Sequence, residues 1–165
     1  MALAVAGGGG GREHALAWGL ERADSVDEVF VGPGNPGTAT VATNIALDTV
    51  NPEAVLQVAR EKAIDLVVIG PEAPLVAGVA DVLRSEGIAT FGPNADGARL
   101  EGSKAWMKEV LVAAGVPTAR HGTFTEAEPA FAFLDTLDGL YVVKTDGLAA
   151  GKGVIVTTSL EEARA

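Results

Sequence analysis

The 165-residue chain contains no cysteine and only two histidines, His14 and His121. The lack of cysteine excludes disulfides, thiol catalysis and cysteine-ligated zinc, and two histidines make a histidine-based metal site unexpected. No apolar run reaches the length of a membrane span, and the N-terminus lacks the basic region and the length of a signal peptide. We therefore expect a cytoplasmic protein with no membrane partner.

Basic residues are also scarce. Twelve lysines and arginines stand against 22 acidic residues, which gives a formal net charge of −10, and the basic residues form no stripe. Nucleic acids are held by clustered positive charge, so no nucleic-acid partner is expected. A hydrophobic fraction of 48% with 21% charged residues predicts a well-buried globular protein rather than a disordered one.

Short apolar runs alternate with amphipathic stretches over the first hundred residues. The pattern predicts strands at 3–6, 28–31, 44–47, 66–69 and 88–91 and helices at 13–22, 52–62 and 76–85, the first helix with Ala15, Leu16, Trp18 and Leu20 inward. The run Leu66 to Ile69 has no polar alternation, which indicates that both faces are covered. The sequence thus predicts an α/β fold, a doubly wound parallel-sheet domain that we assign to residues 1–101.

The alternation ends at Gly92-Pro93-Asn94. The pattern after Asn94 predicts a helical stretch from about 96 to 114, interrupted at Gly102, and then a short strand near 123–124. A helix to about 136 and two further strands are predicted to follow. Capping-box spacing occurs twice, at Thr125 with Glu128 and at Ser159 with Glu162. We assign 102–165 to a second domain and expect it to be incomplete, because a helix begins just before the last residue.

The two strands of the second domain flank a glycine-rich loop, Asp146 to Gly153. Its glycines let backbone N–H groups approach an anion, and Lys152 adds a positive charge, so the loop is predicted to cover a triphosphate. It is not a Walker loop, because three residues rather than four separate Gly147 from Gly151 and Gly153 stands where a hydroxyl is needed. The alternative is a plain β-hairpin that binds no ligand.

Ligands of a doubly wound sheet bind at the carboxyl ends of its strands. The loop after the first strand has five glycines and Arg12, fits no dinucleotide fingerprint, and is suited to a phosphate at a helix N-terminus. The loop 32–38 combines turn formers with an amide and a hydroxyl, and its alternative reading is a plain turn. Glu72, between two prolines, suits ribose hydroxyls or an amine, and the alternative is a solvated glutamate.

Six segments together carry a resemblance: Gly10–Trp18, Pro33–Thr38, Gly70–Leu75, Phe91–Pro93, Leu100–Lys104 and Asp146–Val154. In order and spacing they resemble the phosphoribosylamine–glycine ligase family, also called glycinamide ribonucleotide synthetase, across nearly the whole chain. The sequence departs from the family in having one more glycine before Arg12, in having Thr145 where alanine is usual, and in being less than half the length.

The resemblance implies an ATP-grasp ligase of purine biosynthesis, with an incomplete ATP-grasp domain in this chain. It would join glycine to 5-phosphoribosylamine through glycyl phosphate, with ATP and Mg²⁺ (or Mn²⁺). Residues expected to surround 5-phosphoribosylamine are Gly9, Gly10, Gly11, Arg12, Glu13, Asn35, Gly37, Thr38, Pro71 and Glu72. Those expected to bind ATP are Lys104, Lys144, Asp146, Gly147, Gly151, Lys152 and Gly153.

No catalytic or metal-binding residue is identified within the chain, and the metal ligands are expected beyond Ala165. The chain alone is therefore expected to be inactive and to need the rest of its enzyme as a partner. Two of the lysines have an alternative to the ATP-binding role. Lys104 could be an ordinary exposed helix lysine, and Lys144 could be an edge-strand lysine. For the whole chain, the alternatives are another ATP-grasp ligase or carboxylase and a non-catalytic nucleotide-binding module.

Overall fold

The computed structural model describes residues 1–149 and 152–165, except for the side chains of Leu3, Val5 and Ala6. The chain divides into two compact units, Met1–Arg99 and Leu100–Ala165. Among the described residues, no helix combines the length and the apolar content that crossing a membrane requires.

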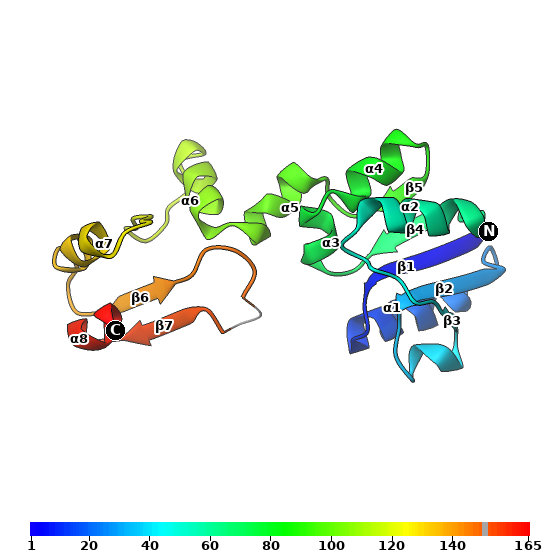
Figure 1. The fold of residues 1–165 in the computed structure, drawn as a ribbon, viewed down its shortest axis with the longest axis horizontal. Helices are drawn as coiled ribbons and strands as arrows, with labels where there is room; N and C mark the ends of the chain where they lie inside the picture. Colours follow the sequence, from blue (N-terminus) through cyan, green and yellow to red (C-terminus); the bar gives the residue numbers. More distant parts are fainter. Residues whose placement is uncertain (150–151) are drawn as a thin grey trace. The chain divides into compact units, whose positions relative to one another are not determined.

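The first unit is built on a five-stranded, all-parallel sheet in the order β3-β2-β1-β4-β5 (Figure 1). The strands are β1 (Ala2–Gly8), β2 (Glu28–Pro33), β3 (Thr43–Asn44), β4 (Leu66–Ile69) and β5 (Ala89–Phe91). Strand order runs outward from β1 in one direction to β3 and from β4 in the other to β5. This confirms the predicted doubly wound fold and puts its topological switch point between β1 and β4.

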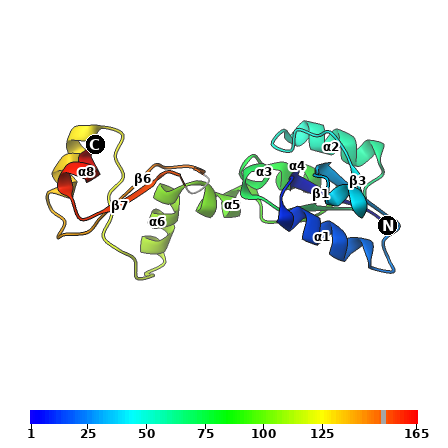
Figure 2. The same cartoon turned by 90° about the horizontal axis from the view of Figure 1, so that it is seen from below.

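Helices cover both faces of this sheet because strand residues alternate between the faces. Val29 and Val31 of β2 pack with Ala17 of α1 (Gly11–Glu21), whereas Phe30 belongs to the larger core on the other face. Figure 2 shows α1 and α2 (Pro52–Glu61) on opposite sides of the strands. The larger core also takes residues from α3 (Glu72–Val76), α4 (Val79–Ser85) and the first turn of α5 (Ala95–Gly102).

The inward face of α1 differs from the prediction. Ala17 is fully buried, while Ala15 is exposed and Trp18 is 52% exposed, with the Arg22 guanidinium stacked 4.8 Å from its ring centroid. Leu16 and Leu20 are half-buried, as expected. The apolar periodicity misplaced the stripe because a charged residue, Glu13, occupies the buried position one turn before Ala17.

Two other elements of the first unit are shorter than predicted. The expected helix 76–85 is interrupted at Gly78, whose φ of +85° is left-handed. The residues after Gly78 form α4, and those before it belong to a separate short helix, α3, which begins at Glu72. The expected strand 44–47 is reduced to β3, and Ile45 and Leu47 pack against the larger core from a loop instead.

The second unit contains α6 (Lys104–Ala113), α7 (Ala127–Leu134), α8 (Leu160–Arg164) and a two-stranded antiparallel sheet. Its strands are β6 (Tyr141–Lys144) and β7 (Val154–Thr157), in a register that pairs Tyr141 with Thr157 and Lys144 with Val154. Leu134, Tyr141 and Ala163 form its buried core.

Three local predictions for the second unit had different outcomes. The strand near 123–124 was wrong, because that segment has no regular structure. The first capping box was also wrong, since α7 begins after Glu126 without a side-chain cap. At α8 the Ser159 hydroxyl does accept the Glu162 N–H at 3.2 Å, but the Glu162 carboxylate accepts from the Thr157 hydroxyl instead of from the backbone of Ser159.

Candidate functional site

The loops after β1, β2 and β4 meet at the carboxyl edge of the first unit's sheet. A Cβ atom on Gly9 would lie 2.8 Å from the carbonyl oxygen of Gly34, and one on Gly7 would lie 2.4 Å from the ring of Pro71. Glycine is required at these places because a side chain on Gly9 would meet the backbone of the β2 loop and one on Gly7, whose φ is +122°, would meet the proline ring. The β1 pairing with β2 also shifts register between Ala6 and Gly8, at the start of the glycine run.

Glu13 lies at the centre of this edge and is only 3% exposed. Its Oε2 accepts the Gly10 N–H at 2.9 Å, and its Oε1 accepts from the Nε of Arg12 at 3.1 Å. We predicted Glu13 as a residue around the substrate. The structure places its carboxylate inward, among the glycines of two loops. No sequence pattern indicated that this glutamate is buried.

Arg12 is the exposed member of this ion pair, with 57% of its side chain accessible. Its Nε is engaged by Glu13, and among the described residues its two terminal nitrogens donate no hydrogen bond. Because those two nitrogens form a planar fork suited to phosphate, Arg12 remains the candidate for an anion at the start of α1.

Asn35 ties the β2 loop to the β1 loop. Its Nδ2 donates to the carbonyls of Gly9 at 3.0 Å and Gly10 at 3.1 Å, and its Oδ1 accepts the N–H groups of Gly37 at 2.7 Å and Thr38 at 3.0 Å. Its polar side-chain atoms therefore shape the loop backbone, and a direct contact with substrate stays a prediction.

Thr38 is fully buried, and its hydroxyl lies 2.6 Å from Oδ1 of Asn44. The amide of Asn44 in turn donates to the Asn35 carbonyl at 2.8 Å. Sequence reasoning missed Asn44, because it treated 44–47 only as a strand. Its place opposite Val31, with its side-chain amide against Gly34, comes from the pairing of β3 with β2.

The β4 loop completes the edge. Pro71 is the residue before α3, and Glu72 is the first residue of that helix and is exposed. A Cβ atom on Gly70 would lie 2.7 Å from Oε1 of Glu13, so this loop packs directly against the β1 loop. Arg12 and Glu72 thus lie in the first turns of the two helices that follow these loops, α1 and α3, and Glu13 and Gly70 bring the two segments into contact.

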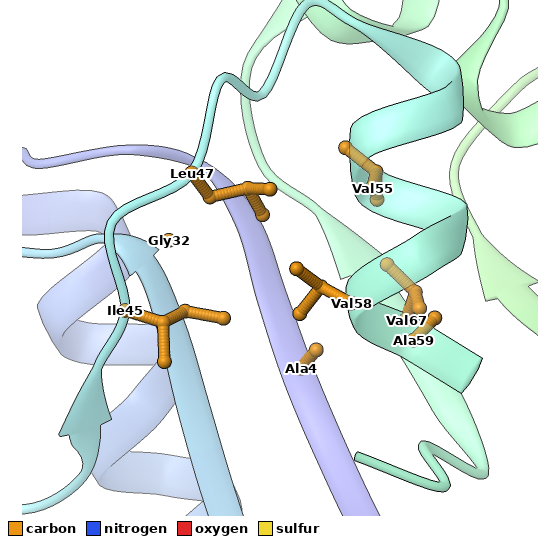
Figure 3. A pocket seen from close by; sticks show the side chains of 8 residues that line it. All are labelled: Ala4, Gly32, Ile45, Leu47, Val55, Val58, Ala59 and Val67. Carbon is orange, nitrogen blue, oxygen red and sulfur yellow. The ribbon is translucent and has the colours of Figure 1, made fainter. Parts of the chain in front are cut away.

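The pocket drawn in Figure 3 is not this edge. It lies between α2, the strands and the segment 45–47, has a volume of about 10 Å³, and is lined by Ala4, Gly32, Ile45, Leu47, Val55, Val58, Ala59 and Val67. Every side chain that lines it is apolar, and its volume is close to that of a single water molecule's site. It is a packing defect in the core rather than a place for a polar substrate.

In the second unit, the glycine-rich loop joins β6 to β7, as predicted. The loop closes through a hydrogen bond from Thr145 N to the Gly153 carbonyl at 2.9 Å and one from Lys152 N to the Ala149 carbonyl at 2.9 Å. A Cβ atom on Gly153 would lie 2.1 Å from Oγ1 of Thr145, so Thr145 requires glycine there. Gly151, predicted to bind ATP, lies outside the described residues.

The lysines predicted to bind ATP differ in their surroundings. Lys144 and Lys152 are exposed, and within the described residues neither ammonium makes a hydrogen bond or an ion pair. Lys104 is half-buried, and its Nζ donates to the Gly147 carbonyl at 2.7 Å. The structure therefore brings Lys104 to the base of the glycine-rich loop, 43 residues later in the chain.

Asp146 was predicted to bind ATP, but its carboxylate faces the start of α6. It accepts hydrogen bonds from the N–H groups of Lys104 at 2.6 Å and Ala105 at 3.2 Å and from the Ser103 hydroxyl at 3.0 Å. These bonds, led by that of Ala105, hold the pKa of Asp146 below its usual range, and desolvation opposes them only in part. Asp146 thus fixes the base of the loop to a helix N-terminus.

We predict that Asp146→Ala lowers the protection of the α6 amides about fivefold at pH 7, the effect of losing roughly 1 kcal/mol of capping at an exposed site. Because the folded-state pKa is lowered, the stabilisation is present above the unfolded value near 4 and is lost as the pH falls through the folded value. The difference from wild type should therefore shrink as the pH falls below about 4. Hydrogen exchange with protection factors at pH 7 and at a series of lower pH values measures it.

Asp138→Ala is the matched control, because Asp138 is an exposed aspartate of the same unit whose side chain makes no hydrogen bond or ion pair among the described residues. Its α6 protection should equal that of wild type. An Asp146→Ala effect that does not shrink as the pH falls from 7 to below 4 would show that the carboxylate charge does not stabilise the helix.

No group of three or more histidine, aspartate or glutamate side chains that could hold a metal ion occurs in the part of the chain that the structure describes. The residues at hand are instead suited to anions: an arginine fork and exposed glycine backbone in the first unit, and lysines around a glycine-rich loop in the second.

The fold has solved counterparts. The crystal structure of phosphoribosylamine–glycine ligase from Thermotoga maritima matches 99% of this chain and 38% of its own length, with a TM-score of 0.78 and 32% identity. The biotin carboxylase domain of the Hydrogenobacter thermophilus 2-oxoglutarate carboxylase matches 98% of this chain and 38% of its own, with a TM-score of 0.77 at 20% identity, which shows the fold alone. Fold and glycine-rich loop together define an ATP-grasp protein.

Family models identify the family to which the chain belongs within this class. Residues 1–101 match the family model described as phosphoribosylglycinamide synthetase, N domain, and residues 102–165 match the model of its ATP-grasp (A) domain. The chain belongs to the phosphoribosylglycinamide synthetase family, as the six segments predicted. It is 51% identical over 160 residues to the phosphoribosylamine–glycine ligase of Escherichia coli strain K12. That match covers 96% of this chain, and the chain spans about 37% of the length of the curated relatives it matches.

Proposed function

We propose that the complete protein carrying this chain is an ATP-dependent carbon–nitrogen ligase that joins glycine to 5-phosphoribosylamine. The products would be glycinamide ribonucleotide, ADP and phosphate, with glycyl phosphate as the intermediate. The observation that carries the proposal is the 51% identity to a phosphoribosylamine–glycine ligase over nearly the whole chain. The glycine-lined edge with Arg12 supports it, because this edge is suited to a sugar phosphate.

The residues of the first unit would bind and orient 5-phosphoribosylamine. The terminal nitrogens of Arg12 would hold its phosphate at the start of α1, and the exposed Glu72 would accept hydrogen bonds from ribose hydroxyls or from the reacting amine. Holding the amine in one orientation favours its attack on an activated carboxyl group, since positioning replaces a random encounter. Asn35 and Thr38 would keep the loop backbone in shape for this contact.

The residues of the second unit would hold the triphosphate of ATP. Lys104, Lys144 and Lys152 would neutralise phosphate charge, and the loop from Gly147 to Gly153 would cover the phosphates with backbone N–H groups. Mg²⁺ would supply further charge neutralisation and would be held by carboxylates outside these 165 residues. The neighbour from Hydrogenobacter thermophilus is described in complex with MgADP.

The test is an assay of the complete protein with glycine, 5-phosphoribosylamine and MgATP. One ADP and one phosphate should form for each glycinamide ribonucleotide, and neither bicarbonate nor another amino acid should replace glycine. ATP use that depends on bicarbonate would favour a carboxylase instead. Calorimetry that detects MgATP binding but no phosphoribosyl compound would favour a non-catalytic nucleotide-binding module. The 165 residues alone are expected to show no turnover.

The loop assignment makes its own prediction. Lys152→Ala in the complete protein should raise KM for ATP about tenfold or more, because a hydrogen bond to a charged group is worth roughly 1.5–3 kcal/mol. The thermal midpoint should stay within about 1 °C of wild type, since the side chain is exposed and unpaired among the described residues. Steady-state kinetics and a thermal melt measure the two effects.

Lys62→Ala serves as the matched control, because Lys62 is an exposed lysine of the first unit whose ammonium lies 5.6 Å from the Phe30 ring centroid and which is not part of the glycine-rich loop. Its KM for ATP should be unchanged. Wild-type ATP kinetics in Lys152→Ala would remove this lysine from the nucleotide site.

A further inference from the structure

The Glu13 carboxylate fills a slot that three glycines line. Cβ atoms on Gly8 and Gly10 would lie 2.8 Å and 3.0 Å from its Oε2, and a Cβ atom on Gly70 would lie 2.7 Å from its Oε1. Two of these glycines come from the β1 loop and one from the β4 loop, on either side of the topological switch point. The missing side chains make room for one carboxylate, not for a ligand.

A carboxylate this deeply buried needs charged and polar partners. Glu13 has them: the Gly10 N–H, the N-terminal end of α1, and the Nε of Arg12. The two partners of this ion pair differ in burial: 57% of the Arg12 side chain is exposed, but only 4% of the Glu13 side chain. One end of the guanidinium is therefore fixed by a buried anion, and the other end is presented to solvent.

We infer that Glu13 is a positioning residue that acts on the substrate through Arg12, and that it does not touch the substrate itself. Its charge orients the guanidinium so that both terminal nitrogens face a phosphate, and its bulk locks the glycine turn of the β1 loop against Gly70. A flexible arginine would lose the entropy of its side chain on binding, and a fixed one has lost it already. The inference rests on the proposed sugar-phosphate site of the first unit.

The experiment is a double-mutant cycle on the complete protein with Glu13→Gln, Arg12→Ala and the double variant. The readouts are the Kd of ribose 5-phosphate by calorimetry, which needs no turnover, and KM and kcat for 5-phosphoribosylamine. Glutamine keeps the size of the side chain but not its charge. Glu13→Gln should weaken ribose 5-phosphate binding and raise KM about tenfold, the scale of one charge-assisted hydrogen bond. The change in kcat should stay below about twofold.

The cycle separates positioning from contact. In the Arg12→Ala background, Glu13→Gln should have no further effect on the Kd or KM, because its target is gone. Additive effects of the two substitutions would overturn the inference, and so would an unchanged Kd in Glu13→Gln or wild-type protein that binds no ribose 5-phosphate. Wild-type protein that binds ribose 5-phosphate in a Glu13-dependent way but does not ligate glycine would refute the proposed function and leave the positioning role standing.

A second variant keeps the inference testable should Glu13→Gln not fold. Gly70→Ala puts a methyl carbon 2.7 Å from Oε1 of Glu13, closer than the two atoms can pack, and should displace the carboxylate and weaken ribose 5-phosphate binding about as much. Gly19→Ala is its control, because Gly19 is in the same unit, on α1, with no atom within 4 Å of a Cβ there. Equal binding by Gly70→Ala and wild type would overturn the inference.

Discussion

Replacing Arg12 and Glu72 together by alanine in the complete protein is expected to lower kcat/KM for 5-phosphoribosylamine by roughly 10²- to 10⁴-fold. Each residue would make a charge-assisted hydrogen bond worth roughly 1.5–3 kcal/mol, and a factor of ten corresponds to about 1.4 kcal/mol. KM for ATP should change little, because the residues proposed to bind ATP belong to the second unit. Steady-state kinetics with each substrate varied in turn measures both parameters.

The matched control is the pair Glu21→Ala with Arg22→Ala. These residues have the same charges, are exposed, and lie at the far end of α1 from Arg12, with Arg22 stacked on Trp18. The control pair should keep kcat/KM within about twofold of wild type. Unchanged formation of glycinamide ribonucleotide by the Arg12 and Glu72 variant would mean that the carboxyl edge of the sheet does not bind the substrate.

Leu83→Ala is expected to destabilise the first unit by about 2–5 kcal/mol. Leu83 is completely buried on α4, and it packs in the larger core with residues of β4 and α2. Truncation removes buried methyl groups and leaves a cavity that close-packed neighbours fill only in part. Since a folded domain is stable by only about 5–15 kcal/mol, this single change removes a large share of its stability.

Hydrogen exchange of the β1 and β4 amides against urea concentration measures this loss for the first unit. Val76→Ala is the control, because Val76 is on the neighbouring helix α3 and is 38% exposed. It should cost less than about 1 kcal/mol. Equal shifts for Leu83→Ala and Val76→Ala would contradict the assignment of the core face.

Much of the fold could be predicted from local patterns. The strand Leu66 to Ile69 is apolar throughout, and only a strand covered on both faces has that pattern, so a parallel sheet with helices on each side followed from it. Pro52 begins α2 and the Ser159 hydroxyl caps α8, because these signals act within one turn of the chain. The glycine-rich hairpin was predictable for the same reason, since both of its strands are adjacent in sequence.

In the candidate site, the sequence pattern failed where a residue's surroundings come from segments distant in the chain. Trp18 was expected to face inward because it is apolar, yet Glu13 takes the inward stripe of α1. Glu13 is buried because Gly70, 57 residues later, leaves room for its carboxylate. The contact of ATP with Asp146 stays a prediction, but the local pattern gave no sign that its carboxylate accepts N–H groups of α6 that lie about 40 residues earlier. No periodicity or local motif carries such information.

The sequence by itself determined the class of fold, the family, and the three strand-end loops and one hairpin loop that carry the candidate site. It could do so because hydrophobic periodicity, glycine spacing and the order of six motifs are properties of neighbouring residues. Only packing in three dimensions shows which polar groups in those loops are exposed and which bond to the protein's own backbone, as Glu13, Asn35 and Asp146 do. A buried carboxylate is stable only where N–H groups, a guanidinium and empty glycine space converge on it, and that convergence exists only once distant segments have packed together.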